Sequence, residues 1–134
     1  MTRTKKIFRT LFFIGLTSFL GLLYVPRLPR VPLVFLNGWL RLDYLAHFLF
    51  NLVLIYLFLL WQSDQRYRVS RGVGLIIFLA GILFCFATEF TQHLVVPQRA
   101  FEIQDLLCNL GGMFTGFMLF LIKSPQQIIN QLFK

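Results

Sequence analysis

Acidic residues are scarce in this chain of 134 residues, which contains 5 Asp and Glu against 13 Lys and Arg. All charged residues together make up 13% of the sequence, whereas hydrophobic residues make up 57% and the mean hydropathy is +0.73. A water-soluble domain needs more polar surface than this composition provides. Because a bilayer-spanning helix needs about 20 apolar residues, the length allows about four spans with short connections. We therefore expect residues 1–134 to form a single transmembrane domain.

Cysteine and histidine are also rare, with 2 of each. Cys85 and Cys108 have neither the number nor the spacing of a metal cluster or a disulfide framework. Inside an apolar span a free thiol behaves as a small hydrophobic group. The sequence also contains no Gly-rich phosphate loop and no internal repeat. We expect neither a metal nor a cofactor.

The net charge of +8 could suggest a nucleic acid as partner. However, the cations flank apolar segments and do not gather on one soluble face, as they do in proteins that bind nucleic acids. We therefore exclude nucleic acid and expect membrane lipid as the partner, with anionic headgroups near the basic residues.

Four nearly uncharged stretches predict an all-α polytopic membrane protein, with about four transmembrane helices in an antiparallel bundle. Leu11–Leu23 and Leu52–Leu60 are apolar on every face, which indicates lipid as their surroundings. Two shorter segments add to this bundle. Val31–Leu42 is too short to cross and is expected to lie in the outer interface, and a helix opened by Ser124-Pro125 is expected in the inner interface. The spans lie near residues 7–25, 44–61, 73–95 and 106–122.

The basic residues divide unequally between the two sides of this bundle. The N-terminus, residues 62–72 and the C-terminal tail hold 9 of the 13, and the other two connections hold 4. Under the positive-inside rule both termini are therefore cytoplasmic. Four of the 5 acids fall at the opposite, outer ends of the spans. A functional site is thus expected to face outward.

Polar residues at membrane depth are the candidates for function, because a charge at the centre of a spanning helix costs about 2.5–3.5 kcal/mol. In the second span Asp43 and His47 are four residues apart and share one helical face near its outer end. Near the outer end of the third span lie Glu89 and Gln92, followed by His93. We expect these side chains to belong to a polar site at the outer end of the bundle.

The fourth span presents a single stripe of polar and small residues. Asp105, Asn109, Gly112 and Gly116 follow one another at spacings of four, three and four residues. The two glycines predict that another helix approaches closely, and the acid and the amide need hydrogen-bond partners that lipid cannot provide. The same glycines could equally serve contact between copies, so an oligomer is possible.

Arg99 lies in the connection between the third and fourth spans, two residues after Pro97. It can therefore reach over the mouth of the bundle. One interpretation is that it pairs with Asp105 or Glu89 to hold the connection in place. The other is that its planar guanidinium receives a phosphate or carboxylate in bidentate geometry, which suits Arg better than Lys. The two roles can coexist.

The order and spacing of these residues resemble the pattern of VanZ-like membrane proteins. The resemblance is carried by Asp43-x3-His47, Glu89-x2-Gln92, Arg99-x5-Asp105-x3-Asn109 and Gly112-x3-Gly116. One departure is Tyr44, where relatives have a lysine beside the acid. The resemblance implies a bacterial cytoplasmic membrane protein that acts on the cell envelope or on lipid-linked molecules, in a family associated with resistance to the glycopeptide antibiotic teicoplanin.

Three classes of function follow from these residues. We favour a non-catalytic protein that binds an envelope amphiphile, or the headgroup of an anionic or lipid-linked envelope molecule, at the outer leaflet. The residues expected to bind it are Arg99, Asp105, Asn109 and Glu89.

The first alternative is an intramembrane enzyme that uses Glu89, His47 and Asp105, with Glu89 or Asp43 as general base beside His47 or His93. We rank it lower because no nucleophile or metal-ligand motif accompanies the histidines. The second alternative is a small lipid translocator in which carboxylates relay protons. The acids cluster near one surface, whereas alternating access needs polar groups near the midplane.

Overall fold

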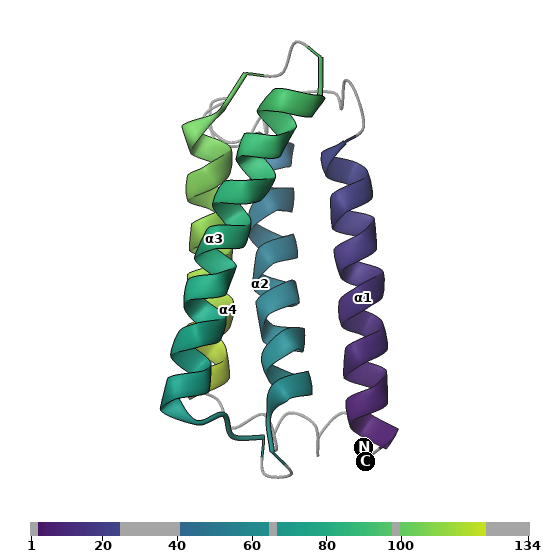
Figure 1. The fold of residues 1–134 in the computed structure, drawn as a ribbon, viewed down its shortest axis with the longest axis vertical. Coiled ribbons are helices and arrows are strands. Elements are labelled where there is room, and N and C mark those ends of the chain that lie inside the picture. The colour runs from purple at the N-terminus through teal and green to yellow at the C-terminus, as the bar shows by residue number, and fades with distance from the viewer. Residues whose placement is uncertain (1–2, 25–40, 65–66, 98–99, 123–134) are drawn as a thin grey trace.

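The computed structural model describes residues 3–24, 41–64, 67–97 and 100–122, which form four helices and no strand (Figure 1). The helices run alternately up and down, so α1 begins and α4 ends at the same end of the bundle. This arrangement is the predicted antiparallel helical bundle. The helices are α1 (Arg3–Leu23), α2 (Leu42–Gln62), α3 (Arg71–Val95) and α4 (Ile103–Ile122).

Three of these helices, α2, α3 and α4, are long and apolar enough to cross a membrane. The multi-pass membrane protein predicted from the sequence is thus supported by the structure. Helix α1 has a similar length of 21 residues, but Arg3, Lys5, Lys6 and Arg9 occupy its first two turns. Its role as a fourth span stays a prediction. Most of the proposed outer interfacial segment and the whole C-terminal interfacial helix lie outside the described residues.

Helices α2 and α4 form the closest pair in the bundle, and two glycines of α4 make this possible. A Cβ atom added to Gly112 would lie only 2.8 Å from the Phe48 carbonyl carbon of α2. One added to Gly116 would lie 2.6 Å from Ile55 Cγ2. Real Cβ atoms essentially never come this close to another heavy atom. The sequence predicted that another helix approaches closely at Gly112 and Gly116. The structure has this close approach, and α2 is the helix that makes it.

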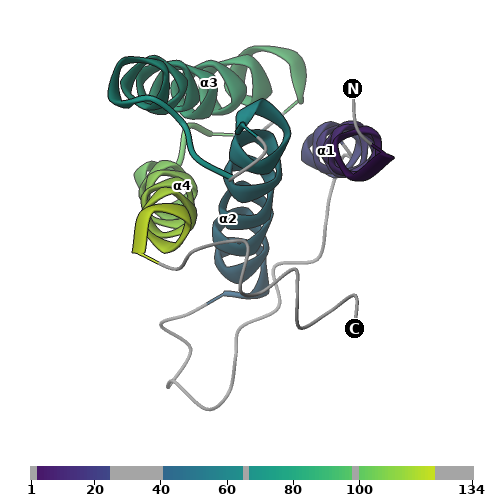
Figure 2. The ribbon, with the colours of Figure 1, turned by 90° about the horizontal axis from the view of Figure 1, so that it is seen from below.

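Helix α1 lies beside α2, on the side away from α4 (Figure 2). Its contacts are largely aromatic. Phe12 packs against Phe58 and Trp61 of α2, with ring centroids 5.1 and 6.0 Å apart. Phe19 is only 2% exposed and packs against Phe50 of α2 and Phe84 of α3. The first helix therefore packs mainly against α2 and also reaches α3 through Phe19.

Two polar contacts fix the ends of α1. At its start, the Lys5 ammonium donates to the backbone carbonyl of Ser63, the residue that follows α2. A cation at this position stabilises the carbonyl end of a helix. At the other end, the hydroxyl groups of Tyr24 and Thr91, the latter in α3, lie 2.7 Å apart. The helix is thus anchored at both ends of the bundle.

Candidate functional site

Buried polar side chains gather at the end of the bundle where α2 begins, α3 ends and α4 begins (Figure 1). They come from all three of these helices and are at most 5% exposed. We call this set the polar cluster. Its members are His47, Asn51, Glu89, Gln92, Asp105 and Asn109. Polar groups at this depth are costly unless they are paired, because lipid offers no hydrogen bonds.

The centre of the polar cluster is a hydrogen-bond network between α2 and α4. Asn51 Nδ2 donates to the backbone carbonyl of His47 at 3.0 Å and to Asn109 Oδ1 at 2.7 Å. His47 Nδ1 lies 3.0 Å from the same Asn109 oxygen. Because that oxygen is an acceptor, His47 Nδ1 must be the donor, which defines the tautomer of the ring. One amide oxygen therefore holds two side chains of the facing helix.

The other ring nitrogen of His47 faces an acid. His47 Nε2 lies 3.7 Å from Asp105 Oδ2, which is an ion-pair distance when the ring is protonated. On its open side the ring meets the edge of Phe19 of α1, with centroids 6.2 Å apart. His47 is thus oriented by three neighbours, Asn109, Asp105 and Phe19, and is screened from lipid.

Asn109 also has a donor group directed into this interior. Its Nδ2 atom is buried and has no hydrogen-bond partner among the described residues. Buried amide groups are nearly always paired with protein or with an ordered molecule. This donor is therefore a place where a water or a ligand atom would be stabilised.

Glu89 joins the end of α3 to the start of α4. Its Oε1 accepts a hydrogen bond from the backbone N–H of Glu102 at 3.2 Å, and its side chain is buried at 1% exposure. Glu102 immediately precedes α4, where helices carry unpaired N–H groups and a partial positive charge. A carboxylate can both accept a hydrogen bond from such an N–H group and offset the partial positive charge.

Arg41 covers the polar cluster at the rim, and sequence reasoning missed it. Its guanidinium pairs with Asp43, lies 2.7 Å from Glu102 Oε2 and donates to the hydroxyl of Tyr44 at 3.1 Å. It also lies over the Tyr44 ring, 4.5 Å from the centroid. Burial by itself would lower the pKa of Arg41, but the hydrogen bonds and charges of Asp43 and Glu102 outweigh it and raise the pKa above its usual value.

Arg41 also contacts Tyr44, the residue at which the sequence departs from the VanZ-like pattern. The cation beside Asp43 is supplied here from two residues earlier in the chain, while Tyr44 contributes a ring and a hydroxyl that contact the same cation. An Arg two residues before an Asp at the start of a predicted span was the only sequence signal for this contact. Its second partner, Glu102, is 61 residues away.

The structure brings together most of the predicted site residues but not all of them. His47, Glu89, Gln92, Asp105 and Asn109 lie in the polar cluster, and Asp43 lies at its rim. His93 is exposed on α3. Arg99 lies outside the described residues. Asn51 was not predicted, and neither were Cys85, whose Sγ lies 3.7 Å from Asn51 Oδ1, and the buried Thr88.

Among the described residues, no three His, Cys, Asp or Glu side chains are grouped so that they could hold a metal ion. The polar cluster is instead built for hydrogen bonding, since it mixes carboxylates, amides and one imidazole. Such a set can bind a polar headgroup, hold a proton or fix the helices to one another.

These features define the class of the protein: a multi-pass helical membrane protein with a buried polar cluster at one end of its bundle. A comparison with protein families then identifies the family, because the VanZ/LLP1 family model matches residues 6–124. The chain belongs to the VanZ/LLP1 family, which confirms the resemblance seen in the motifs and extends it to α1. No curated protein and no solved structure matches the chain significantly.

Proposed function

We propose that the polar end of this bundle binds the headgroup of an amphiphilic or lipid-linked molecule of the bacterial cell envelope, at the outer face of the cytoplasmic membrane. The observation that carries the proposal is the polar cluster itself. Six polar side chains are buried at one end of a bundle whose helices expose many large hydrophobic side chains. Intramembrane ionisable residues of this kind mark binding sites, ion pathways or catalytic sites by default.

Two features favour binding of a polar group at this end. The buried Asn109 Nδ2 donor points to an acceptor atom as its partner. In addition, the connection between α3 and α4 contains Arg99, whose guanidinium suits a phosphate or carboxylate. Arg41 is already engaged by two carboxylates. Arg99 is therefore the residue that we assign to the headgroup.

The experiment is native mass spectrometry of the protein purified in mild detergent from its own membranes, comparing wild type with Arg99→Ala. We expect wild type to retain a defined anionic molecule and Arg99→Ala to lose most of it, by about tenfold, because a hydrogen bond to a charged group contributes about 1.5–3 kcal/mol. Arg68→Ala, at the opposite end of the bundle, is the matched control and should retain it. Equal spectra for all three proteins would refute the proposal.

One observation supports an acid–base enzyme as the second candidate. His47 is oriented by Asn109 and faces Asp105, an arrangement suited to passing a proton. The same spectra distinguish this candidate from simple binding. An enzyme should carry a different bound molecule in wild type from that in Glu89→Gln, because the variant would accumulate unreacted substrate. An identical molecule in both proteins would exclude it.

A further inference from the structure

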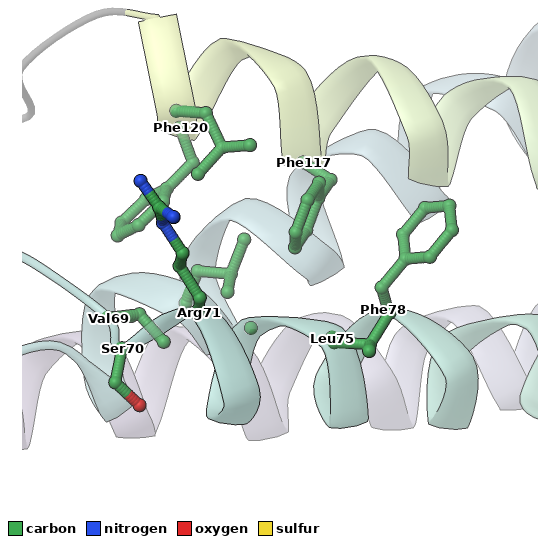
Figure 3. Close-up of a pocket in the computed structure, with 10 residues that line it drawn as sticks. Val69, Ser70, Arg71, Leu75, Phe78, Phe117 and Phe120 are labelled. Carbon is green, nitrogen blue, oxygen red and sulfur yellow. The ribbon is translucent and has the colours of Figure 1, made fainter.

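A second feature lies at the opposite end of the bundle, where α3 begins and α4 ends. A groove of about 210 Å³ runs there between these two helices, with Leu59 of α2 among its lining residues (Figure 3). Its walls are apolar along most of their length. The polar lining residues, Ser70 and Arg71, both lie at the start of α3. The groove is therefore apolar along most of its length and has a cation at its mouth.

Gly74 lies on the wall of the groove. The atoms nearest to a Cβ placed there belong to Phe117 and Val69, at 3.8 and 3.9 Å, which is ordinary van der Waals contact, so a larger side chain would be needed to fill the groove. Phe78 and Phe117 pack against each other with ring centroids 5.0 Å apart, at the end of the groove away from Val69 and Ser70 (Figure 3). The cavity thus ends against two aromatic rings and opens toward the beginning of α3.

The side of the groove faces the surroundings of the bundle. Leu75 and Leu121, one on each wall, are 57% and 59% exposed. On a membrane-spanning helix such leucines contact lipid chains. An acyl chain can therefore enter the groove laterally from the bilayer without displacing any part of the described protein.

The charge at the mouth selects an anion. Arg71 is in the first turn of α3, where the helix dipole is positive, and Arg68 lies three residues earlier. The start of α1 adds four further basic residues at this end of the bundle. Among the described residues at this end, the one acid is Asp64, which accepts a hydrogen bond from the backbone N–H of Arg68. The positive charge at this end would attract a zwitterionic lipid less strongly than an anionic one.

We infer that the groove is a binding site for one anionic glycerophospholipid, with an acyl chain between α3 and α4 and the phosphate at Arg71 and the start of α3. The occupant is a lipid of the leaflet next to this end of the bundle. This site is separate from the polar cluster, which lies at the other end of the same helices. Its failure would leave the proposed function of the polar cluster untouched.

The test adds phosphatidylglycerol and phosphatidylcholine with identical acyl chains to the full-length protein in detergent and counts bound lipid by native mass spectrometry. We expect wild type to retain one phosphatidylglycerol in preference to phosphatidylcholine. Arg71→Gln should reduce this preference about fivefold, because each basic residue contributes about 1 kcal/mol to the binding of anionic lipid. Gly74→Leu fills the groove and should reduce retention of both lipids.

Each variant has a matched control. Arg68→Gln removes an equal charge that does not line the groove, and Gly72→Leu adds the same side chain to the same turn of α3, where nothing lies within 4 Å. Gly72→Leu should behave as wild type, and Arg68→Gln should lower the preference less than Arg71→Gln does, because Arg68 does not line the groove. The inference is overturned if wild type shows no preference, if Arg68→Gln loses it equally, or if Gly72→Leu releases lipid as readily as Gly74→Leu. Arg71 is exposed, so Arg71→Gln remains informative even if Gly74→Leu fails to fold.

Discussion

Gly112→Ala is expected to destabilise the protein by about 1–3 kcal/mol, as overpacking of a close-packed interior does. The added methyl group would lie within 2.9 Å of the Phe48 Cα and still nearer its carbonyl. These are backbone atoms, which cannot rotate away, so α2 must shift as a whole. The measurement is thermal unfolding in detergent micelles, followed by circular dichroism.

The neighbouring glycine supplies a matched control for this substitution. A Cβ atom at Gly111 would meet the Phe48 ring at 3.6 Å, which is an ordinary van der Waals contact. Gly111→Ala should therefore leave the melting temperature unchanged or raise it slightly, since alanine favours helix more than glycine does. If the two variants have the same melting temperature, α2 does not approach α4 as closely as the structure indicates.

The same shift of α2 would also reach the polar cluster. Phe48 follows His47 directly, and Gly112 lies three residues after Asn109, so the glycine contact sits beside the hydrogen bond between His47 and Asn109. Retention of the anionic molecule that we propose to bind there should fall in Gly112→Ala and persist in Gly111→Ala. Helix packing and the proposed site are thus coupled through one pair of helices.

Asn109→Leu is the second substitution with a large expected effect. It removes the oxygen that accepts from both His47 Nδ1 and Asn51 Nδ2 and leaves these buried donors without that acceptor. We expect a loss of about 1–3 kcal/mol, the cost of an unsatisfied buried group, which is large for a hydrogen bond between membrane helices. Unfolding by denaturant in mixed micelles measures it.

A double-mutant cycle separates this network from a simple change of volume. Asn51→Leu in the Asn109→Leu background removes a donor that has already lost its partner on α4. The loss in the double variant should therefore be smaller than the sum of the two single losses, by at least about 0.5 kcal/mol. Strict additivity would show that the two amides do not stabilise each other.

The main elements could be predicted from the sequence because apolar runs and single polar residues are local signals. The stripe of Asp105, Asn109, Gly112 and Gly116 predicted one face of α4, and the structure places all four in the interior. The partners of that face could not be predicted, because a glycine does not reveal which helix approaches it. That Phe48 and Leu52 are the residues in contact depends on the register between α2 and α4.

Arg41 and Asn51 show why part of the site was missed. Arg41 contributed to the sequence argument only as one of the positive charges used for orientation, although its guanidinium joins Asp43 to Glu102 across 61 residues. Asn51 continues the four-residue spacing of Asp43 and His47 along α2, which is a local signal for that face, but no spacing connects it with Asn109 or Cys85. Contacts between distant segments leave no periodic trace in a single sequence.

The proposed binding of an envelope headgroup depends on the polar cluster facing out of the cell, and thiol labelling in intact cells tests this most directly. In a background with Cys85→Ala and Cys108→Ala, single cysteines are placed in the connections at each end, as Gln98→Cys and Gln65→Cys. We expect a membrane-impermeant maleimide to label Gln98→Cys in intact cells, and Gln65→Cys only after permeabilisation, because the positive-inside rule predicts that the more basic connections are cytoplasmic. Labelling of Gln65→Cys, but not of Gln98→Cys, in intact cells would contradict the account.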